Sequence, residues 1–222
     1  MQITGAIFDM DGTLIDSLMF WDVLWKRLGI AYRQNPNFRP DAMTEKEIRT
    51  LPLREGMHLL HQRCGLGADG DALWQMADSM CARFYAEEVQ LKPGVLPFLQ
   101  YCRQKGIRMC ICSATDRALL NIVIRKFRLD DYLPMVFSCS EIGKGKEAPD
   151  IFLQAHAAIG TPKVSTWVFE DSITALQTAQ IAGFKTVGVY DAYGFSEEQV
   201  KQYATVYIDR AETLERLIAK IE

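Results

Sequence analysis

Short apolar runs rich in β-branched residues alternate with longer helical stretches, and this alternation constrains the fold more than any other feature. The runs have the length of strands, and the stretches between them carry apolar residues at helical spacing. Strands joined by helices require crossover connections, which predict a parallel sheet covered by helices on both faces. We therefore expect an α/β fold with a Rossmann-like parallel sheet core. The predicted strands span residues 3–8, 107–112, 135–138, 166–169, 186–190 and 206–208.

One long segment interrupts the alternation. Only helical patterns occur in it, followed by a turn at Lys92-Pro93-Gly94. We expect an all-helical domain at 17–91, inserted into a core built from 1–16 and 92–222, with linkers near residues 15–17 and 90–94. The helices predicted for this insert span residues 20–28, 44–48, 54–64 and 71–88.

Composition excludes several classes of protein. The chain has 222 residues, of which 49% are hydrophobic, and a net charge of −3. This mild acidity gives no reason to expect nucleic acid or an anionic membrane as a partner. No apolar run approaches the ~20 residues that span a bilayer, and the first residues do not resemble a signal peptide. Six cysteines without CxxC spacing predict reduced thiols. We expect a cytoplasmic protein that is monomeric, with a dimer left open.

The first predicted strand ends in Asp9-Met10-Asp11-Gly12-Thr13. Side chains alternate along an extended chain, so Asp9 and Asp11 point to one side and Met10 points to the core. Two neighbouring carboxylates repel each other, and burial increases that repulsion. Such a pair favours a bound cation, although a polar turn that caps a helix is the simpler explanation of the segment alone.

Polar residues also follow the other predicted strands. Each has an ordinary explanation by itself, such as a helix cap, a solvated lysine, or an acid favoured at a helix start. In a parallel sheet, however, the carboxyl ends of the strands meet in one crevice, where ligands bind. Four carboxylates facing one lysine would favour a hard dication, and Mg²⁺ suits a site that also takes phosphate oxygens. The residues gathered there are Asp9, Asp11, Ser113, Ala114, Lys146, Glu170 and Asp171.

In number and order these motifs resemble the haloacid dehalogenase-like superfamily, in its phosphatase and β-phosphoglucomutase branch. The matching elements are Asp-x-Asp-Gly-Thr, a serine after the second core strand, Lys-x-x-Pro-Asp, and Glu-Asp after the fourth. The resemblance implies a Rossmann-like core with a helical cap after the first motif. It also implies a Mg²⁺-dependent phosphoric monoester hydrolase that acts on a small phosphorylated metabolite.

The resemblance further implies a role for each residue. Asp9 is similar to the nucleophile that forms an aspartyl-phosphate, and Asp11 to the general acid and base. Lys144 is a rival to Lys146, although the Pro149-Asp150 that follows favours Lys146. By resemblance, the Mg²⁺ ligands are Asp9, Asp11 through its backbone carbonyl, Glu170 and Asp171, and the phosphate is bound by Ser113, the Ala114 N–H and Lys146.

Two alternatives to a phosphatase stay open, a β-phosphoglucomutase-like mutase and a non-catalytic phosphate-binding regulator. Dehalogenation is disfavoured because family dehalogenases lack the second aspartate. The mutase pattern has a Gly-x-Ser-Arg element in the cap, which residues 44–50 lack, and a lysine where this chain has Asp116. We therefore favour hydrolysis. The candidate substrate-specificity residues of the helical insert are Lys46, Arg49 and Arg54, each of which is equally consistent with a solvated helix charge.

Overall fold

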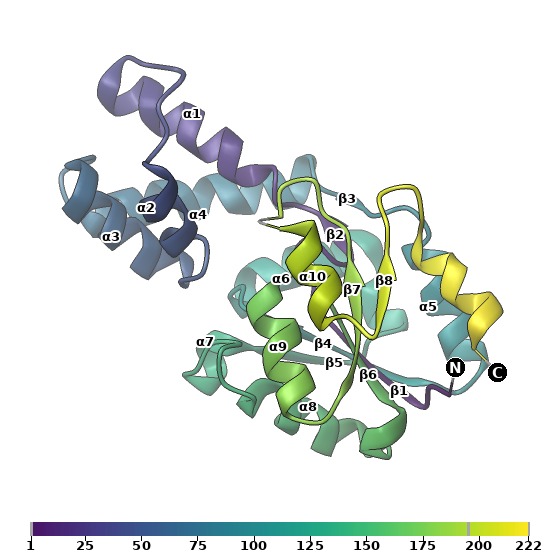
Figure 1. The fold of residues 1–222 in the computed structure, drawn as a ribbon. Helices are drawn as coiled ribbons and strands as arrows, with labels where there is room; N and C mark the ends of the chain where they lie inside the picture. The colour runs from purple at the N-terminus through teal and green to yellow at the C-terminus, as the bar shows by residue number, and fades with distance from the viewer. Residues whose placement is uncertain (1, 195, 222) are drawn as a thin grey trace. The chain divides into compact units, whose positions relative to one another are not determined.

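The structure, a computed structural model, describes residues 2–194 and 196–221 and separates into two compact units (Figure 1). The first, the core unit, contains the residues up to Leu18 together with those from Val89 onward. The second, the helical unit, is Met19–Glu88.

The core unit is built on a parallel sheet in the order β5-β4-β1-β6-β7-β8. Strand β1 is central, so that Phe8 lies between Ile111 on one side and Phe169 on the other. The predicted α/β fold with a parallel, Rossmann-like sheet is confirmed. The strands are β1 (Gly5–Phe8), β4 (Arg108–Ser113), β5 (Met135–Ser138), β6 (Thr166–Glu170), β7 (Lys185–Val189) and β8 (Val206–Ile208).

Helices cover both faces of this sheet (Figure 1). On one face, Ile7 and Val168 pack in a buried cluster with α8 (Asp150–Ile159) and α9 (Ile173–Ile181). On the other face, Phe8 and Phe169 pack with Phe98 of α5 (Val95–Gln104), at ring-centroid distances of 4.4–6.2 Å. The apolar strands are therefore buried on both sides, as their near-continuous hydrophobicity predicts. The remaining helices of this unit are α6 (Arg117–Phe127), α7 (Cys139–Ile142), α10 (Glu197–Tyr203) and the 3₁₀ turns η1 (Leu129–Asp131), η2 (Lys163–Ser165) and η3 (Leu214–Lys220).

A two-stranded antiparallel ribbon joins the ends of the helical unit to the core. Strands β2 (Ile15–Asp16) and β3 (Gln90–Leu91) pair Ile15 with Leu91 and Asp16 with Gln90. Sequence analysis predicts linkers at these positions and no strands. Two residues per strand are too few for an alternating pattern to be visible.

The helical unit contains no strand, and the structure describes all of its residues. Its first helix continues past the predicted end at residue 28 as far as Arg33, and Gly29 lies inside it. A Cβ at Gly29 would come within 2.2 Å of the Asn35 carbonyl oxygen, so this glycine permits close packing of the following segment. None of the helices in the described ranges has the length and apolar content needed to span a membrane. The helices are α1 (Phe20–Arg33), α2 (Ala42–Ile48), α3 (Leu53–Cys64) and α4 (Gly70–Glu87).

Candidate active site

The candidate site begins at the turn that follows β1. The Asp9 backbone N–H donates to the Phe169 carbonyl at 2.9 Å, which places the Asp9 side chain at the carboxyl end of the central strand. Met10 is fully buried, as the side-chain alternation predicts. The chain then turns sharply, with the Leu14 and Ile15 N–H groups both donating to the Met10 carbonyl.

Lys146 connects the ends of two strands. Its ammonium group donates to a carboxylate oxygen of Asp9 and to one of Glu170, and the side chains of all three residues are no more than 10% exposed. The second oxygen of Glu170 accepts the Ser172 N–H at 3.0 Å. Lys144, the rival lysine, is more than half exposed and instead pairs with Asp150 at 2.6 Å. The structure therefore places Lys146 at the site.

Asp171 lies against the turn that follows β1. The Thr13 hydroxyl donates to its Oδ1 at 3.3 Å. Gly12 has a φ of +81°, and a Cβ there would lie 2.6 Å from Asp171 Oδ2. Glycine is thus required at position 12 both by its backbone conformation and by the approach of this carboxylate.

Asp9, Glu170 and Asp171 form a cluster able to hold a metal ion, with one oxygen of each within 4.8 Å of the others. Burial raises the pKa of Asp9 well above its usual value; Lys146 opposes that rise, and the neighbouring carboxylates add to it. Burial, followed by the charge of Glu170, raises the pKa of Asp171 to about 8. Burial by itself would lower the pKa of Lys146, but the charges of Asp9 and Glu170 raise it above its usual value. One ammonium thus faces three carboxylates, and this oxygen-rich, negatively charged donor set fits Mg²⁺.

The carboxylate of Asp11 accepts hydrogen bonds from residues outside that cluster. Its Oδ1 accepts the Ser17 hydroxyl at 2.7 Å, and its Oδ2 accepts the Thr115 hydroxyl at 2.8 Å. Both carboxylate oxygens are therefore held by neutral donors, while Asp9 two residues earlier is held by a cation. The two aspartates have different surroundings, which suits a nucleophile beside a proton carrier.

The predicted phosphate-binding residues follow β4. Ser113 ends that strand and is buried, and its Oγ accepts the Thr115 N–H at 3.1 Å. Ala114 is exposed. The hydroxyl of Thr115, the residue after Ala114, donates to Asp11.

The chain matches the haloacid dehalogenase-like hydrolase family over residues 3–183. It belongs to that family. The predictions of this family and of an enzyme of the hydrolase class are confirmed. The haloacid dehalogenase-like hydrolase described here is 28% identical over 195 residues to hexitol phosphatase B of Escherichia coli K12, covering 85% of this chain and 84% of that protein. It is 23% identical over 183 residues to a phosphorylated carbohydrates phosphatase of Thermotoga maritima, covering 82% and 83% of the two chains.

Solved structures of this hydrolase family share the fold. CbbY from Rhodobacter sphaeroides, solved in complex with phosphate, has a TM-score of 0.79 at 19% identity, and the match covers 97% of this chain and 96% of that one. A hydrolase from Pseudomonas syringae has a TM-score of 0.76 at 21% identity, with 99% and 100% of the chains covered.

The basic residues predicted for specificity differ in their surroundings within the helical unit of this hydrolase. Lys46 is exposed. The Arg49 side chain is only 10% exposed and lies 3.9 Å from Glu45, to which Arg39 also binds. Arg54 is exposed, pairs with Asp71 at 3.0 Å and lies over the Trp74 ring. Arg49 and Arg54 thus already have acidic partners inside this unit.

Sequence analysis missed the contacts that orient the acidic residues. Ser17 falls in a segment predicted to be a linker, and its bond to Asp11 depends on the turn at residues 10–15. Thr13 is recognisable in the sequence only as part of the motif that follows the first strand. Hydroxyl residues are common in loops, so no sequence signal distinguishes those that bind a carboxylate from the rest.

Proposed function

We propose that this protein is a Mg²⁺-dependent phosphatase that hydrolyses a small phosphorylated metabolite through an aspartyl-phosphate on Asp9. One observation carries the proposal: Asp9 is held by the Lys146 ammonium, while Asp11, two residues later, is held by two hydroxyl groups. The two relatives named above as phosphatases of phosphorylated carbohydrates and hexitols support a sugar phosphate or a similar compound as the substrate.

In the proposed reaction, an Asp9 carboxylate oxygen attacks phosphorus and the bond to the leaving oxygen breaks. Asp11 donates a proton to that oxygen, so the product leaves as a neutral alcohol. Asp11 then takes a proton from water, whose oxygen attacks the phosphorus of the aspartyl-phosphate and releases inorganic phosphate and the Asp9 carboxylate. The transferring phosphoryl group is bound by Ser113, the Ala114 N–H and Lys146. These groups position it and neutralise its charge, which is what phosphoryl transfer chiefly requires.

Asp9, Glu170 and Asp171, with the Asp11 backbone carbonyl, would hold the Mg²⁺. The ion would supply charge neutralisation for the phosphoryl oxygens. The helical unit would choose the substrate and exclude bulk water, and Lys46, Arg49 and Arg54 remain its candidate specificity residues. We further propose a reducing, cytoplasmic location, on the ground that all six cysteines are free thiols. The oligomeric state that we propose is a monomer, with a dimer left open.

The test is phosphate release from a panel of hexose and hexitol phosphates, phosphoglycolate, nucleoside monophosphates and an aryl phosphate, with Mg²⁺ and with EDTA. We expect Mg²⁺-dependent release that Asp9→Asn abolishes and that Asp11→Asn lowers by about 10²–10⁴-fold. Asp16→Asn, an exposed aspartate on β2, is the matched control and keeps the wild-type rate.

Two results would contradict the proposal. Phosphate release that continues in EDTA would show that the reaction does not need Mg²⁺. Substantial release by Asp9→Asn would show that Asp9 is not the nucleophile. If no substrate releases phosphate but β-glucose 1-phosphate is isomerised, the enzyme is a mutase instead.

A further inference from the structure

An ion pair in the core unit lies beside the metal cluster and has no place in the reaction described above. Lys92 directly follows β3, and its backbone N–H donates to the Leu14 carbonyl at 2.9 Å. Its ammonium group reaches the loop after β7, where it lies 2.8 Å from Asp191 Oδ2 and donates to the Tyr190 carbonyl at 2.7 Å. Only 14% of the Lys92 side chain and 2% of the Asp191 side chain are exposed.

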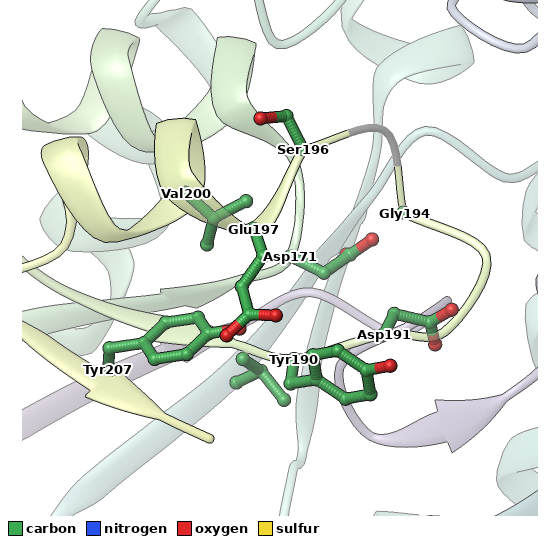
Figure 2. Close-up of a pocket in the computed structure, with 9 residues that line it drawn as sticks. Asp171, Tyr190, Asp191, Gly194, Ser196, Glu197, Val200 and Tyr207 are labelled. Atoms are coloured by element: carbon green, nitrogen blue, oxygen red, sulfur yellow. The ribbon is translucent and has the colours of Figure 1, made fainter. Parts of the chain in front are cut away.

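Asp191 also organises its own loop. Its Oδ1 accepts the Tyr193 N–H at 2.8 Å, so each carboxylate oxygen has a partner. Asp191 lines a small cavity of about 20 Å³. Figure 2 shows it there with Asp171, Glu197 and Tyr207, which also line this cavity. One wall of the site near Asp171 is therefore the segment that Lys92 and Asp191 tie down.

Asp171 and Asp191 line the same small cavity, and the charges of both members of the pair act on the pKa of Asp171. After burial and Glu170, the Lys92 charge lowers the pKa of Asp171 and the Asp191 charge raises it. Asp171 also adjoins the turn after β1, where the Thr13 hydroxyl donates to it and Gly12 leaves room for its carboxylate. Asp171 thus adjoins both that turn and the loop held by the ion pair.

A buried ion pair is a poor device for stability, because the cost of removing both charges from water offsets their attraction. Apolar side chains of similar volume would often serve the fold equally well. A lysine and an aspartate at this place therefore call for an explanation other than core packing, and their neighbour Asp171 supplies one.

We propose that the Lys92–Asp191 pair positions the Mg²⁺ ligand Asp171, with Lys92 and Asp191 acting as positioning residues that do not touch the substrate. This inference rests on the proposed function, because it assumes that Asp171 binds Mg²⁺. Residues behind a metal ligand fix the orientation of that ligand, and their loss typically weakens metal binding 10–100-fold.

Positioning and simple electrostatics predict opposite results for one variant. Lys92→Met removes a positive charge near the metal cluster, so a purely electrostatic effect would tighten Mg²⁺ binding. If the pair holds Asp171 in place, Lys92→Met and Asp191→Asn both raise the Mg²⁺ dissociation constant, by about 10–100-fold. The same weakening is expected for the double variant Lys92→Met/Asp191→Leu, which leaves no buried charge unpaired and so decides the question if a single variant does not fold.

The experiment is a calorimetric titration of the full-length, metal-free protein with MgCl₂, with kcat measured separately at saturating Mg²⁺. Lys105→Met makes the same chemical change at an exposed position after α5 and keeps wild-type affinity. We expect weakened binding with kcat recovering at saturating Mg²⁺, because the pair acts on ligand placement and touches no reacting atom.

Mg²⁺ binding that is unchanged or tighter in the folded variants overturns this inference alone. A wild-type protein that binds no Mg²⁺ overturns both this inference and the Mg²⁺ dependence of the proposed function. A wild type that binds Mg²⁺ but releases no phosphate overturns the proposed function, while the comparison of dissociation constants still decides the role of the pair.

Discussion

A single ammonium group, that of Lys146, neutralises part of a buried carboxylate cluster, and this makes position 146 sensitive to substitution. Lys146→Met leaves Asp9 and Glu170 buried without their shared counter-charge. Removing one partner of a buried ion pair typically costs about 3–5 kcal/mol, and we expect a loss of that order in the free energy of unfolding, measured by urea denaturation in EDTA. Lys144→Met, which breaks an exposed pair in the same loop, should change it little.

The deficit of Lys146→Met should depend on pH. Asp9 has a raised pKa in the folded protein, and Lys146 limits that rise. A carboxyl with a higher pKa folded than unfolded destabilises the fold as pH rises from the unfolded value toward the folded one. Without Lys146 the folded pKa of Asp9 is higher still, so the deficit widens as pH rises through the wild-type value. A deficit in urea denaturation that does not grow as the pH rises above the ordinary range of a carboxyl group would contradict this account.

Gly12 is the position where a single methyl group should disturb the metal cluster. Gly12→Ala imposes a left-handed conformation on alanine, which costs roughly 1–2 kcal/mol, and brings Cβ to within 2.6 Å of Asp171 Oδ2. We expect Gly12→Ala to have a lower Tm than the wild type, and we expect that adding Mg²⁺ no longer raises its Tm.

Gly106→Ala separates those two effects. Gly106 has a φ of +68° and no atom within 4 Å of its added Cβ. It therefore carries the same backbone strain without the clash, and its Tm should still rise with Mg²⁺. If both variants respond to Mg²⁺ alike, the close approach of Asp171 is not what requires Gly12.

At the scale of residues, the sequence predicts which side chains meet but not how they divide their contacts. Asp9, Lys146, Glu170 and Asp171 follow strands of one parallel sheet, and topology alone brings them together. The bonds that Ser17 and Thr115 make to Asp11 depend on rotamers and on a turn of six residues, which no spacing pattern encodes.

At the scale of elements, the helical unit offers a test of local capping. Asp69 precedes α4, and its carboxylate accepts the Ala72 N–H at 2.8 Å. Asp69→Ala should destabilise this helix by about 0.5–2 kcal/mol, seen as faster amide hydrogen exchange in α4. Asp69→Asn keeps an acceptor oxygen and should exchange as the wild type does; equal exchange in all three proteins would show that the cap does not stabilise α4.

The six core strands are predicted within one or two residues. Burial gives β1, β4, β6 and β7 largely apolar runs, and the half-buried edge strands β5 and β8 are apolar as well. Elements without such a run are missed: the ribbon of β2 and β3, the four-residue α7, and α10, which buries only Val200. The predicted end of α1, before Gly29, is too early, because glycine in a sequence often marks the end of a helix. In the structure this glycine instead permits a close approach of the backbone.

At the scale of the whole molecule, the paired linkers predict that the core unit can fold without the helical unit. The ends of the insert meet where Asp16 pairs with Gln90, so a short glycine-containing turn can replace Met19–Glu88 and close a hairpin. We expect the shortened protein to unfold cooperatively, as followed by circular dichroism, and to gain Tm with Mg²⁺. A shortened protein that is unfolded at all Mg²⁺ concentrations would contradict the independence of the core.

The central place of β1 has a consequence for synthesis. This strand is made before the other strands of the sheet, yet its neighbours are β4 and β6, and the Lys146 that binds Asp9 lies 137 residues further along the chain. Contacts so distant in sequence form late and slowly, whereas the helix pairs of the insert are local and form early. A nascent chain therefore carries β1 with both edges unpaired until β4 has been made, and with one edge unpaired until β6 has been made. The time that the ribosome takes to pass from β1 to β6, which codon usage sets in part, should therefore affect chaperone binding and aggregation during expression.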